Sequence, residues 1–472
     1  MTHINALRSL QRDPAGMSQG VVATYPRGPA PLSPQELARK YARMVPRYTS
    51  YPTAPHFHGG VTGETYGHWL GELPEGVELS IYAHVPFCDT LCWFCGCNTK
   101  IVQRYDPVAA YMPKLLQEIA LVSELLPAGR SCSHLHWGGG SPTLLTAADM
   151  RELGAVLTAA FPLTADAEFA VEIDPRDLRD DQVAALAEIG VTRASLGVQD
   201  IDPEVQRAIN RIQPLDCTTE AVARLRATGV EDLNVDLVYG LPYQDSARLL
   251  RSVEAMIALQ PARFALFGYA HVPQMKRHMR LIPEEALPGA DERFDMAETA
   301  AERLVAAGYL RIGLDHFALP DDPMARRQGE GQLRRNFQGY TADRAEALIG
   351  FGASAIGQLP QGLVQNATPL HAYGDAIAAG CLSTAKGVAL SAEDKRRAGL
   401  IERLMCDLTV EVPEDLAATV GAEVVEMADD GLLTWDGRTI EVTERGRPFL
   451  RCVAALFDAY LNPVRDRHSV AV

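Results

Sequence analysis

A repeated alternation of strand-length apolar runs with helical patterns limits the possible folds of this chain more than any other feature. The apolar runs lie at 79–85, 135–137, 169–173, 194–198, 233–239, 264–270 and 312–317, and helical spacing appears between them, as at 107–126, 146–160 and 181–189. Such repetition predicts parallel strands joined by right-handed crossover helices. Six or more units favour an α/β fold built on a βα barrel, full or partial, over a small open sheet.

Polar side chains and glycines gather just after these runs. They are Cys88, Cys92, Gly138 to Gly140, Glu172, Gln199, Asp236 and His271. In a βα barrel these positions share the carboxyl-terminal rim, where active sites form. Their varied chemistry predicts a functional site at that rim.

The segments on either side of this region have different patterns. Residues 1–60 are rich in Pro, Gly and Arg, and Ser33, Pro34 and Glu36 mark one helix start, which predicts an N-terminal arm with one short helix. The barrel is expected over 61–380. Residues 381–472 contain helical patterns at 391–406 and 413–430, followed by a hairpin signal at Asp436-Gly437. They predict a smaller, mainly helical, winged-helix-like C-terminal domain that acts as a lid.

Charge and composition exclude several function classes. The 44 basic and 60 acidic residues give a net charge of −16, the wrong sign for a general nucleic-acid binder. The would-be recognition helix at 422–430 has four acidic residues and no basic one, which also argues against DNA. No run approaches the ~20 apolar residues of a membrane helix. The first 20 residues lack the apolar core of a secretory signal, and the nine cysteines are mostly scattered, which favours a reducing cytoplasm.

One short segment concentrates the metal-binding chemistry. Cys88, Cys92 and Cys95 form a C-x3-C-x2-C pattern on the loop after the first predicted strand. Thiolates select zinc or iron–sulfur clusters, and a structural zinc site needs a second cysteine pair that this sequence lacks. Three thiolates can hold a [4Fe–4S] cluster with one iron open to a small molecule. Two alternatives remain: Cys97 as a fourth ligand of a closed cluster, or core cysteines gathered by chance.

The C-x3-C-x2-C pattern after a first barrel strand resembles the radical S-adenosylmethionine (SAM) superfamily. The longer match resembles the oxygen-independent coproporphyrinogen III oxidase family within it, over roughly residues 40 to 460. The matching motifs are 82–98 (YAHVPFCDTLCWFCGCN), 136–143 (HWGGGSPT), 172–176 (EIDPR), 197–200 (GVQD), 210–211 (NR), 234–242 (NVDLVYGLP), 269–271 (YAH), 315–318 (DHFA) and 335–340 (RNFQGY).

The resemblance implies roles for particular residues. Cys88, Cys92 and Cys95 would ligate a [4Fe–4S] cluster, and two SAM molecules would lie beside it. Tyr82, Gly139, Glu172 and Ile356 match positions around the cluster-bound SAM. The positions around the second SAM are matched by Phe94, Gly140, Ser141, Gln199, Arg211, Asp236 and Ala270. Tyr82, His84 and Cys97 are the candidate catalytic residues, the last two as proton or hydrogen-atom carriers.

The resemblance also implies a reaction. Reductive cleavage of SAM would give a 5′-deoxyadenosyl radical, which takes a hydrogen atom from a propionate side chain. This oxidoreductase would convert two propionates of coproporphyrinogen III to vinyl groups in haem biosynthesis, giving protoporphyrinogen IX. Its partners would be the substrate and a low-potential electron donor such as flavodoxin or ferredoxin, with no nucleic acid or membrane, and the chain is expected to be a monomer. Two alternatives are a radical-SAM-like haem chaperone and a haem-degrading radical SAM enzyme.

The substrate of that reaction carries four carboxylates, whereas the chain is acidic overall. Its site would therefore need locally concentrated cations, since guanidinium groups pair with carboxylates in a bidentate manner. The candidates are Arg47, Arg207, Arg211, Lys276, Arg277 and Arg335.

Overall fold

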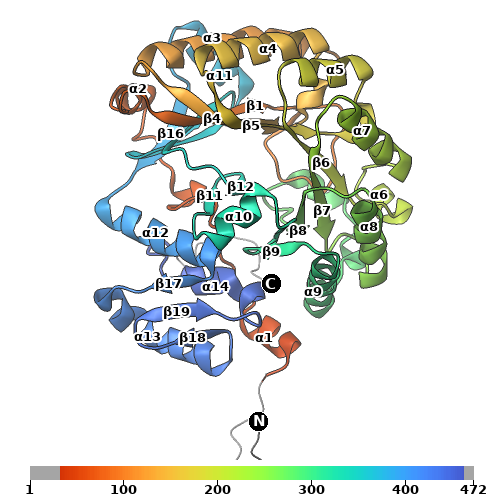
Figure 1. The fold of residues 1–472 in the computed structure, drawn as a ribbon, viewed down its shortest axis with the longest axis vertical. Coiled ribbons are helices and arrows are strands. Elements are labelled where there is room, and N and C mark those ends of the chain that lie inside the picture. The colour runs from red at the N-terminus through yellow and green to blue at the C-terminus, as the bar shows by residue number, and fades with distance from the viewer. Residues whose placement is uncertain (1–31, 462–472) are drawn as a thin grey trace, which may run out of the picture.

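A curved sheet with helices on its outer face dominates the computed structural model, which describes residues 32–461 (Figure 1). Within these residues the sheet has twelve strands in the order β16-β15-β14-β13-β1-β4-β5-β6-β7-β8-β10-β9. Its centre is six parallel strands, namely β1 (Glu78–Val85), β4 (Ser131–Gly139), β5 (Leu163–Ile173), β6 (Arg193–Gln199), β7 (Asp232–Tyr239) and β8 (Arg263–Gly268). The order is open at both ends, so the expected α/β barrel is confirmed in its partial form.

Helices cover the convex side of this sheet, as the alternating sequence pattern predicts (Figure 1). They are α3 (Asp106–Leu125), α4 (Ala147–Ala160), α5 (Asp180–Glu188), α6 (Pro203–Ala208), α7 (Leu215–Ala227), α8 (Ser246–Ala258) and α9 (Ala290–Ala306). In α8, Leu249, Val253 and Met256 recur at helical spacing and are all buried. This spacing places one apolar stripe against the sheet. The resulting core also contains Trp137, Phe169 and many other strand residues.

Antiparallel strands extend the sheet at both edges. One edge continues through β13 (Ala347–Phe351), which is parallel to β1, to β14 (Ile356–Leu359), β15 (Gly362–Asn366) and β16 (Thr384–Ala389). The other edge ends with β10 (His316–Ala318) and β9 (Leu310–Ile312). The single strand predicted over 312–317 is therefore wrong. Gly313, with φ +52°, turns the chain back and leaves two short antiparallel strands.

Shorter elements fill the connections. They are α2 (Gly63–Gly71), α10 (Pro323–Gly329), α11 (Leu370–Ala378), the strand pairs β2 (Phe87–Cys88) with β3 (Lys100–Ile101) and β11 (Arg334–Asn336) with β12 (Gly339–Thr341), and 3-10 turns at Ala54–His56, Pro142–Leu144, Pro175–Asp177, Arg277–Leu281, Glu284–Ala286 and Arg447–Phe449. No helix among residues 32–461 is long and apolar enough to cross a membrane.

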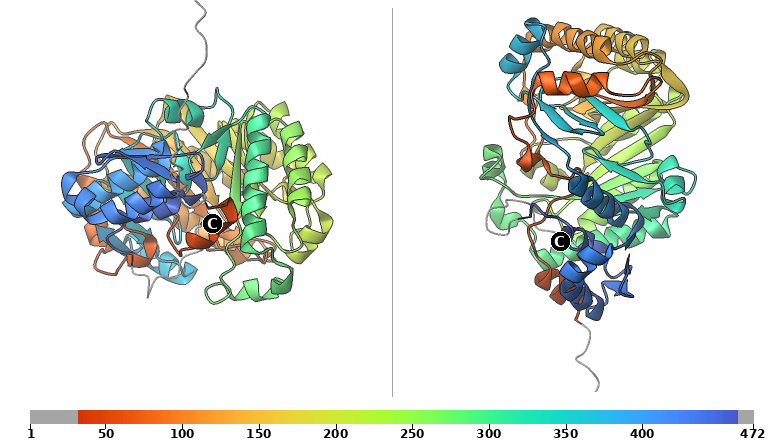
Figure 2. Two further views of the ribbon diagram at one scale, coloured as in Figure 1. Left: turned by 90° about the horizontal axis from the view of Figure 1, so that it is seen from below. Right: turned by 90° about the vertical axis from the view of Figure 1, so that its left-hand side faces the viewer.

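The C-terminal region forms a second core together with the N-terminal arm (Figure 2). It contains α12 (Ala392–Asp407), α13 (Glu414–Asp429), α14 (Leu450–Ala455) and a small sheet of β17 (Thr409–Glu411), β19 (Thr439–Val442) and β18 (Leu433–Trp435). The expected short helix of the arm is α1 (Pro34–Lys40), which begins with the capping box of Ser33 and Glu36. Tyr41, Tyr48 and Tyr51 of the arm are buried in this second core.

The division of the chain at residues 60 and 380 stays a prediction. Two structural facts bear on it: β16, at 384–389, belongs to the large sheet, and arm residues share a core with residues 400–457. Residues 1–31, where the sequence predicts no secretory signal, and 462–472, the end of the expected C-terminal domain, lie outside the described residues.

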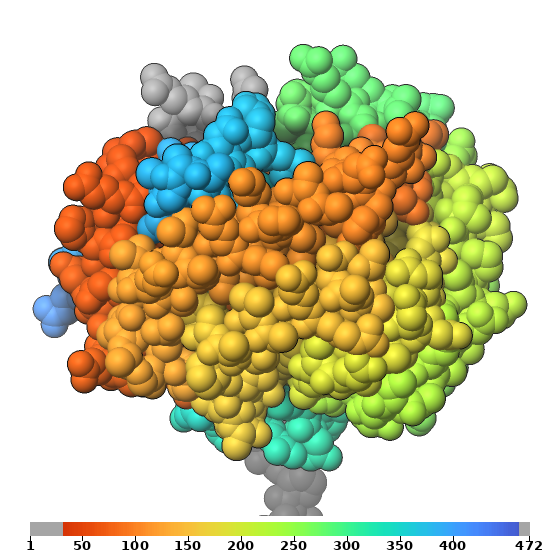
Figure 3. Space-filling model, turned by 90° about the horizontal axis from the view of Figure 1, so that it is seen from above, coloured from red at the N-terminus to blue at the C-terminus, as the bar shows by residue number. Residues whose placement is uncertain are grey.

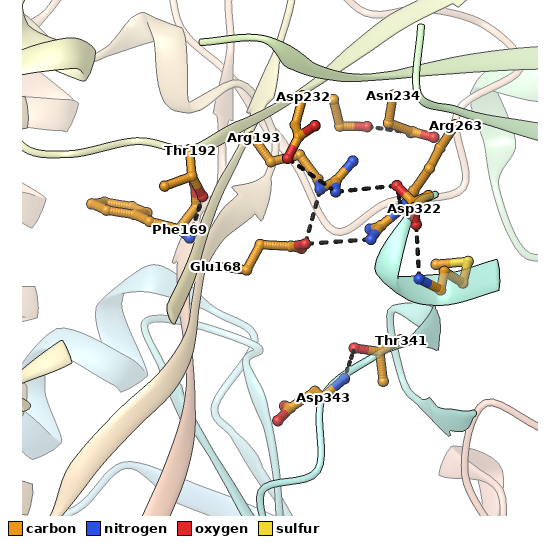
Figure 4. Close-up of polar contacts among 12 residues, drawn as sticks. Glu168, Phe169, Thr192, Arg193, Asp232, Asn234, Arg263, Asp322, Thr341 and Asp343 are labelled. Atoms are coloured by element: carbon orange, nitrogen blue, oxygen red, sulfur yellow. Dashed lines mark hydrogen bonds and ion pairs between the residues drawn. The ribbon is translucent and has the colours of Figure 1, made fainter. Parts of the chain in front are cut away.

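A buried cluster of charges lies at the amino-terminal end of the parallel strands (Figure 4). Asp322, just before α10, accepts a hydrogen bond from Arg263 Nε at 2.7 Å and one from Arg193 Nη2 at 3.3 Å. Arg193 Nε also donates to Glu168 at 2.9 Å. The Asp322 and Arg193 side chains are only 1% and 4% exposed. This ion cluster ties α10 to β5, β6 and β8 and closes one end of the partial barrel.

Candidate functional site

The rim at the carboxyl-terminal ends of the parallel strands contains a cavity of about 330 Å³. Gly139 and Gly140 reach it from the end of β4, Glu172 from β5, Gln199 from β6 and Asp236 from β7. The rest of its lining includes Phe94, Arg211 and the four cysteines at 88, 92, 95 and 97. The structure therefore brings together most of the residues that the sequence patterns single out.

The cysteine loop, defined as residues 88–99, leaves β2 and returns through β3. Neighbouring segments hold its backbone in place. The amide of Trp93 donates to Ile209 O at 2.9 Å, Asn210 Nδ2 donates to Leu91 O at 2.8 Å, and His278 Nε2 lies 2.8 Å from Cys95 O. The loop therefore has a defined path although it lies outside the main sheet.

The thiols of the cysteine loop have different environments. Burial raises the pKa of Cys88 to about 12. A hydrogen bond from the Cys97 thiol lowers the pKa of Cys95 to about 6, and the nearby Lys276 and His278 act in the same direction. Cys92 is buried, whereas Cys97 is exposed. Thiolates are the form that binds metals, so the hydrogen bond from Cys97, aided by the nearby cations, favours the form of Cys95 that ligates a metal.

Arg211 crosses the cavity wall and is itself buried. Its Nη1 group donates to Asp174 at 3.1 Å and lies 3.6 Å from Cys92 Sγ, and its Nη2 group donates to Gly197 O at 2.6 Å. Burial alone would raise the pKa of Asp174, but hydrogen bonds from Arg176 and the charge of Arg211 hold it at about 2. Arg211 Nε is buried without a partner among the described atoms. A ligand with an acceptor atom would satisfy it.

The glycine turn after β4 fits closely around its neighbours. The Gly139 amide donates to Glu172 Oε2 at 3.0 Å, and His136 Nε2 lies 3.2 Å from the other oxygen. Gly139 has φ +114°, and a Cβ atom there would lie 2.3 Å from the His84 ring. A Cβ atom on Gly140 would lie 2.4 Å from Phe87 O. Only glycine fits these two positions without movement of the His84 ring or of the backbone at Phe87.

Gly139→Ala is expected to lower the free energy of unfolding by about 1–3 kcal/mol, because alanine is strained at that φ and collides with His84. Urea denaturation of the reconstituted protein measures the change. Gly374→Ala is the matched control, since no atom lies near its added Cβ within α11, and it should be neutral or stabilising by up to about 1 kcal/mol. Equal stability of Gly139→Ala and the unmodified protein would contradict the predicted strain.

Asp236 lies in a polar group at the boundary between this cavity and a second one of about 210 Å³. Asn234 Nδ2 donates to Asp236 Oδ1 at 2.8 Å, and Ser195 Oγ donates to Oδ2 at 3.3 Å. Burial, aided by the charge of Glu172, raises the pKa of Asp236 to about 6. The carboxyl therefore ionises near neutrality and is a good acceptor for ligand hydroxyl groups above that pH.

The raised pKa predicts a pH-dependent difference between Asp236→Asn and the unmodified protein. A raised pKa favours the protonated folded form, so the stabilisation is complete below the unfolded value of 3.8 and is lost as the pH rises through about 6. Over that window the unmodified protein should lose up to about 3 kcal/mol relative to the variant. Chemical denaturation at pH 4.5, 6 and 7.5 measures this trend. Parallel curves for the two proteins would disprove it.

Tyr82 and His84 lie next to each other on β1, behind the glycine turn. Tyr82 OH is 2.9 Å from His84 Nδ1, and His84 Nε2 lies 3.4 Å from both Asn98 O and Ser354 Oγ. Burial lowers the pKa of His84 and raises that of Tyr82, so both are neutral at pH 7. Neither residue lines the cavity wall.

Comparison with known proteins identifies the family. Residues 82–256 match the radical SAM superfamily. The oxygen-independent coproporphyrinogen III oxidase of Bradyrhizobium diazoefficiens is 49% identical over 448 residues, which cover 93% of this chain and 99% of that protein. The enzyme of the same name from Paracoccus denitrificans is 46% identical over 441 residues, which cover 91% of this chain and 96% of that protein. The chain belongs to the oxygen-independent coproporphyrinogen III oxidase family. A solved structure of coproporphyrinogen III oxidase from Escherichia coli, a radical SAM enzyme, has a TM-score of 0.84 and 36% identity over 88% of this chain and 98% of that one.

As a member of the coproporphyrinogen III oxidase family, the chain is an oxidoreductase that uses a [4Fe–4S] cluster and SAM. The site fits these cofactors. One cavity is lined by three thiols of the cysteine loop, by Arg211 and by the glycine turn after β4. Among the described atoms, Arg211 Nε is buried without a partner, and the glycines leave room for a ligand close to the backbone. Within residues 32–461 no three His, Cys, Asp or Glu side chains converge on one metal ion. A cluster does not need such convergence, because each cysteine binds a different iron atom.

Three other residues suggested by the coproporphyrinogen III oxidase resemblance do not line the 330 Å³ cavity. Ser141 Oγ lies 2.8 Å from Thr143 Oγ1, Ile356 lies on β14, and Ala270 follows β8. Conversely, the cavity contains Ser195, Gly197 and Phe267, which the sequence analysis did not select. The residues at 195, 197 and 199 of β6 alternate as half-buried positions between buried ones. This period of two was the signal that could have identified Ser195 and Gly197, whereas Phe267 lies on β8 and had no such signal.

Proposed function

We propose that this chain catalyses oxygen-independent oxidative decarboxylation of two propionate side chains of coproporphyrinogen III, giving protoporphyrinogen IX. The observation that carries this proposal is the cavity that joins three cysteine thiols to the strand-end groups Glu172, Gln199 and Asp236. Near full-length identity to coproporphyrinogen III oxidases supports the choice of substrate. The reaction removes a hydrogen atom, carbon dioxide and one further electron from each propionate.

Cys88, Cys92 and Cys95 would hold the cluster in this proposal. When bound, the cluster and SAM supply an electron and a carbon-centred radical that abstracts hydrogen from the propionate. The protein positions these groups and keeps water away from them. Cys92 is buried, and Arg211 beside it places a fixed positive charge near its sulfur.

Two SAM molecules would lie along the strand ends. The first would contact Tyr82, Gly139, Glu172 and Ile356. The proposed contacts of the second are Phe94, Gly140, Ser141, Gln199, Arg211, Asp236 and Ala270. Support comes from the half-buried carboxylates of Glu172 and Asp236, since acidic groups at strand ends accept hydrogen bonds from a ribose. Seven of these eleven residues line the 330 Å³ cavity.

His84, Cys97 and Tyr82 are proposed to carry protons or hydrogen atoms. The 2.9 Å contact between Tyr82 OH and His84 Nδ1 gives a proton path within β1. The Cys97 thiol is exposed beside Cys95, where it can exchange a hydrogen atom with a bound molecule. Both features are compatible with these roles without requiring an ionised group at pH 7.

The proposal also includes the surroundings of the reaction. We expect a cytoplasmic monomer without nucleic-acid or membrane partners, reduced by a low-potential protein such as flavodoxin or ferredoxin. Net charge of −16 supports the absence of a nucleic-acid partner.

The decisive experiment is anaerobic incubation of the reconstituted protein with SAM, dithionite and coproporphyrinogen III. Protoporphyrinogen IX and 5′-deoxyadenosine should form, with two molecules of carbon dioxide released per porphyrinogen. Stable binding of haem without turnover would instead indicate a haem chaperone. Loss of haem under the same conditions would indicate a haem-degrading enzyme, and either result would contradict the proposal.

A further inference from the structure

A large groove lies against a second side of the cysteine loop. It has a volume of about 810 Å³ and shares Leu91, Cys97 and Thr99 with the 330 Å³ cavity at the strand ends. Cationic or titratable basic side chains line it, and we define this set as the basic groove: Lys100, Lys276, Arg277, His278 and His371. Its described lining contains no aspartate or glutamate. In a chain of net charge −16, such a concentration is unusual.

The basic groove is formed by segments that are distant in sequence. Figure 3 shows the light-blue chain around α11 and the green chain around residue 280 as projections on the same side of the molecule. Lys100 and Arg277 are exposed, and the side chain of Met275 beside them is 59% exposed. The groove therefore presents exposed positive charges next to an accessible apolar residue, a composition suited to a protein partner.

Two residues of the basic groove contact the backbone of the cysteine loop directly. Lys276 Nζ donates to Cys97 O at 3.0 Å, and His278 Nε2 lies 2.8 Å from Cys95 O. A partner in the groove would thus be separated from the proposed cluster by the thickness of one loop. Glu172 and Asp236, which face the reacting side, do not line this groove. The arrangement places a docking surface on one side of the loop and the chemistry on the other.

We propose that the basic groove docks a small acidic redox protein that reduces the cluster. This inference rests on the proposed function, which requires an electron donor, and it assigns the donor's position and charge. The carrier, a flavin or iron–sulfur protein, would pass one electron to the cluster and be oxidised by one electron. Opposite charges would steer the two proteins together, and the interface would be small and sensitive to salt, as redox contacts are.

The test compares two charge-reversed double variants of the reconstituted protein. Lys100→Glu with Arg277→Glu changes the groove, and Lys395→Glu with Arg438→Glu makes the same change of charge at exposed positions of the C-terminal region. Calorimetry with oxidised flavodoxin measures affinity at low and at high salt. The groove variant should bind on the order of tenfold more weakly at low salt and lose most of its salt dependence, whereas the control should change little.

Rates of cluster reduction provide a second measurement that does not need turnover. Reduced flavodoxin should reduce the cluster of the groove variant at least several-fold more slowly, while dithionite should reduce it at the normal rate. Equal flavodoxin affinity for both variants would overturn the docking proposal. So would a higher KM for coproporphyrinogen III with unchanged flavodoxin binding, because the groove would then hold substrate carboxylates. Failure of the proposed function would appear separately, as absence of vinyl product with dithionite in the unmodified protein.

Discussion

Cys92→Ser is expected to purify without iron–sulfur absorbance and to have no detectable decarboxylase activity. Cys92 is buried beside Arg211 and central to the three-thiol set, so a serine hydroxyl there leaves a soft iron site with a hard, neutral ligand. Anaerobic reconstitution followed by iron and sulfide analysis, with electron paramagnetic resonance of the reduced protein, measures the loss. Circular dichroism establishes that the variant is folded.

Cys97→Ser is the matched control, because this thiol is exposed on the same loop and five residues away. It should keep iron and sulfide at the level of the unmodified protein, because the serine hydroxyl can still donate the hydrogen bond that lowers the pKa of Cys95. Its decarboxylase activity should fall, because Cys97 is proposed to act as a hydrogen-atom carrier after the cluster has been assembled. Loss of the cluster in Cys97→Ser, or its retention in Cys92→Ser, would show that the ligand set is wrong.

Asp322→Ala should lower the free energy of unfolding by about 3–5 kcal/mol, since it leaves Arg193 and Arg263 buried with too little negative charge. The same carboxylate accepts a hydrogen bond from Met324 N at 2.8 Å at the start of α10, so the helix cap is lost as well. Guanidinium denaturation measures the change, and both the midpoint and the slope should be recorded.

The neighbouring Asp321 offers a close comparison. Its side chain is 99% exposed and pairs with the exposed Arg326 at 3.4 Å. Asp321→Ala removes the same charge from the adjacent position, yet it should change the unfolding free energy by no more than about 0.5 kcal/mol. If Asp322→Ala proved as mild as Asp321→Ala, the ion cluster would not be what holds α10 against the barrel.

Local patterns were sufficient to predict the central part of the fold. The parallel strands have apolar runs, and the helices between them have spaced apolar residues, so a βα barrel follows from neighbouring residues alone. Whether that barrel is full or partial was left open by the sequence, and the open strand order decides it. The same reasoning placed Glu172, Gln199 and Asp236 at one rim, where the cavity lies. The cysteine pattern located the metal chemistry because ligand spacing is itself local.

Features that depend on distant residues could not be predicted. The return of β13 to the side of β1 joins residues more than 250 positions apart, and no local signal in 347–351 specifies that pairing. The ion cluster could not be predicted either, because nothing near Glu168, Arg193 or Asp322 in the sequence indicates that the fold buries these charged residues together. Ile356, Ser141 and Ala270 came from a resemblance alone, and the described structure places them outside the cavity wall.

The core shared by the two ends of the chain has a consequence for biosynthesis. The arm residues Leu37, Tyr41 and Tyr48 leave the ribosome well before most of their packing partners, which lie between residues 400 and 457. At about 5–20 residues per second, the arm waits about 20–70 s without its partners. The nascent chain therefore exposes an apolar arm to chaperones until residues 400–457 have been made, and deletion of either segment would leave the apolar side chains of the other exposed to solvent.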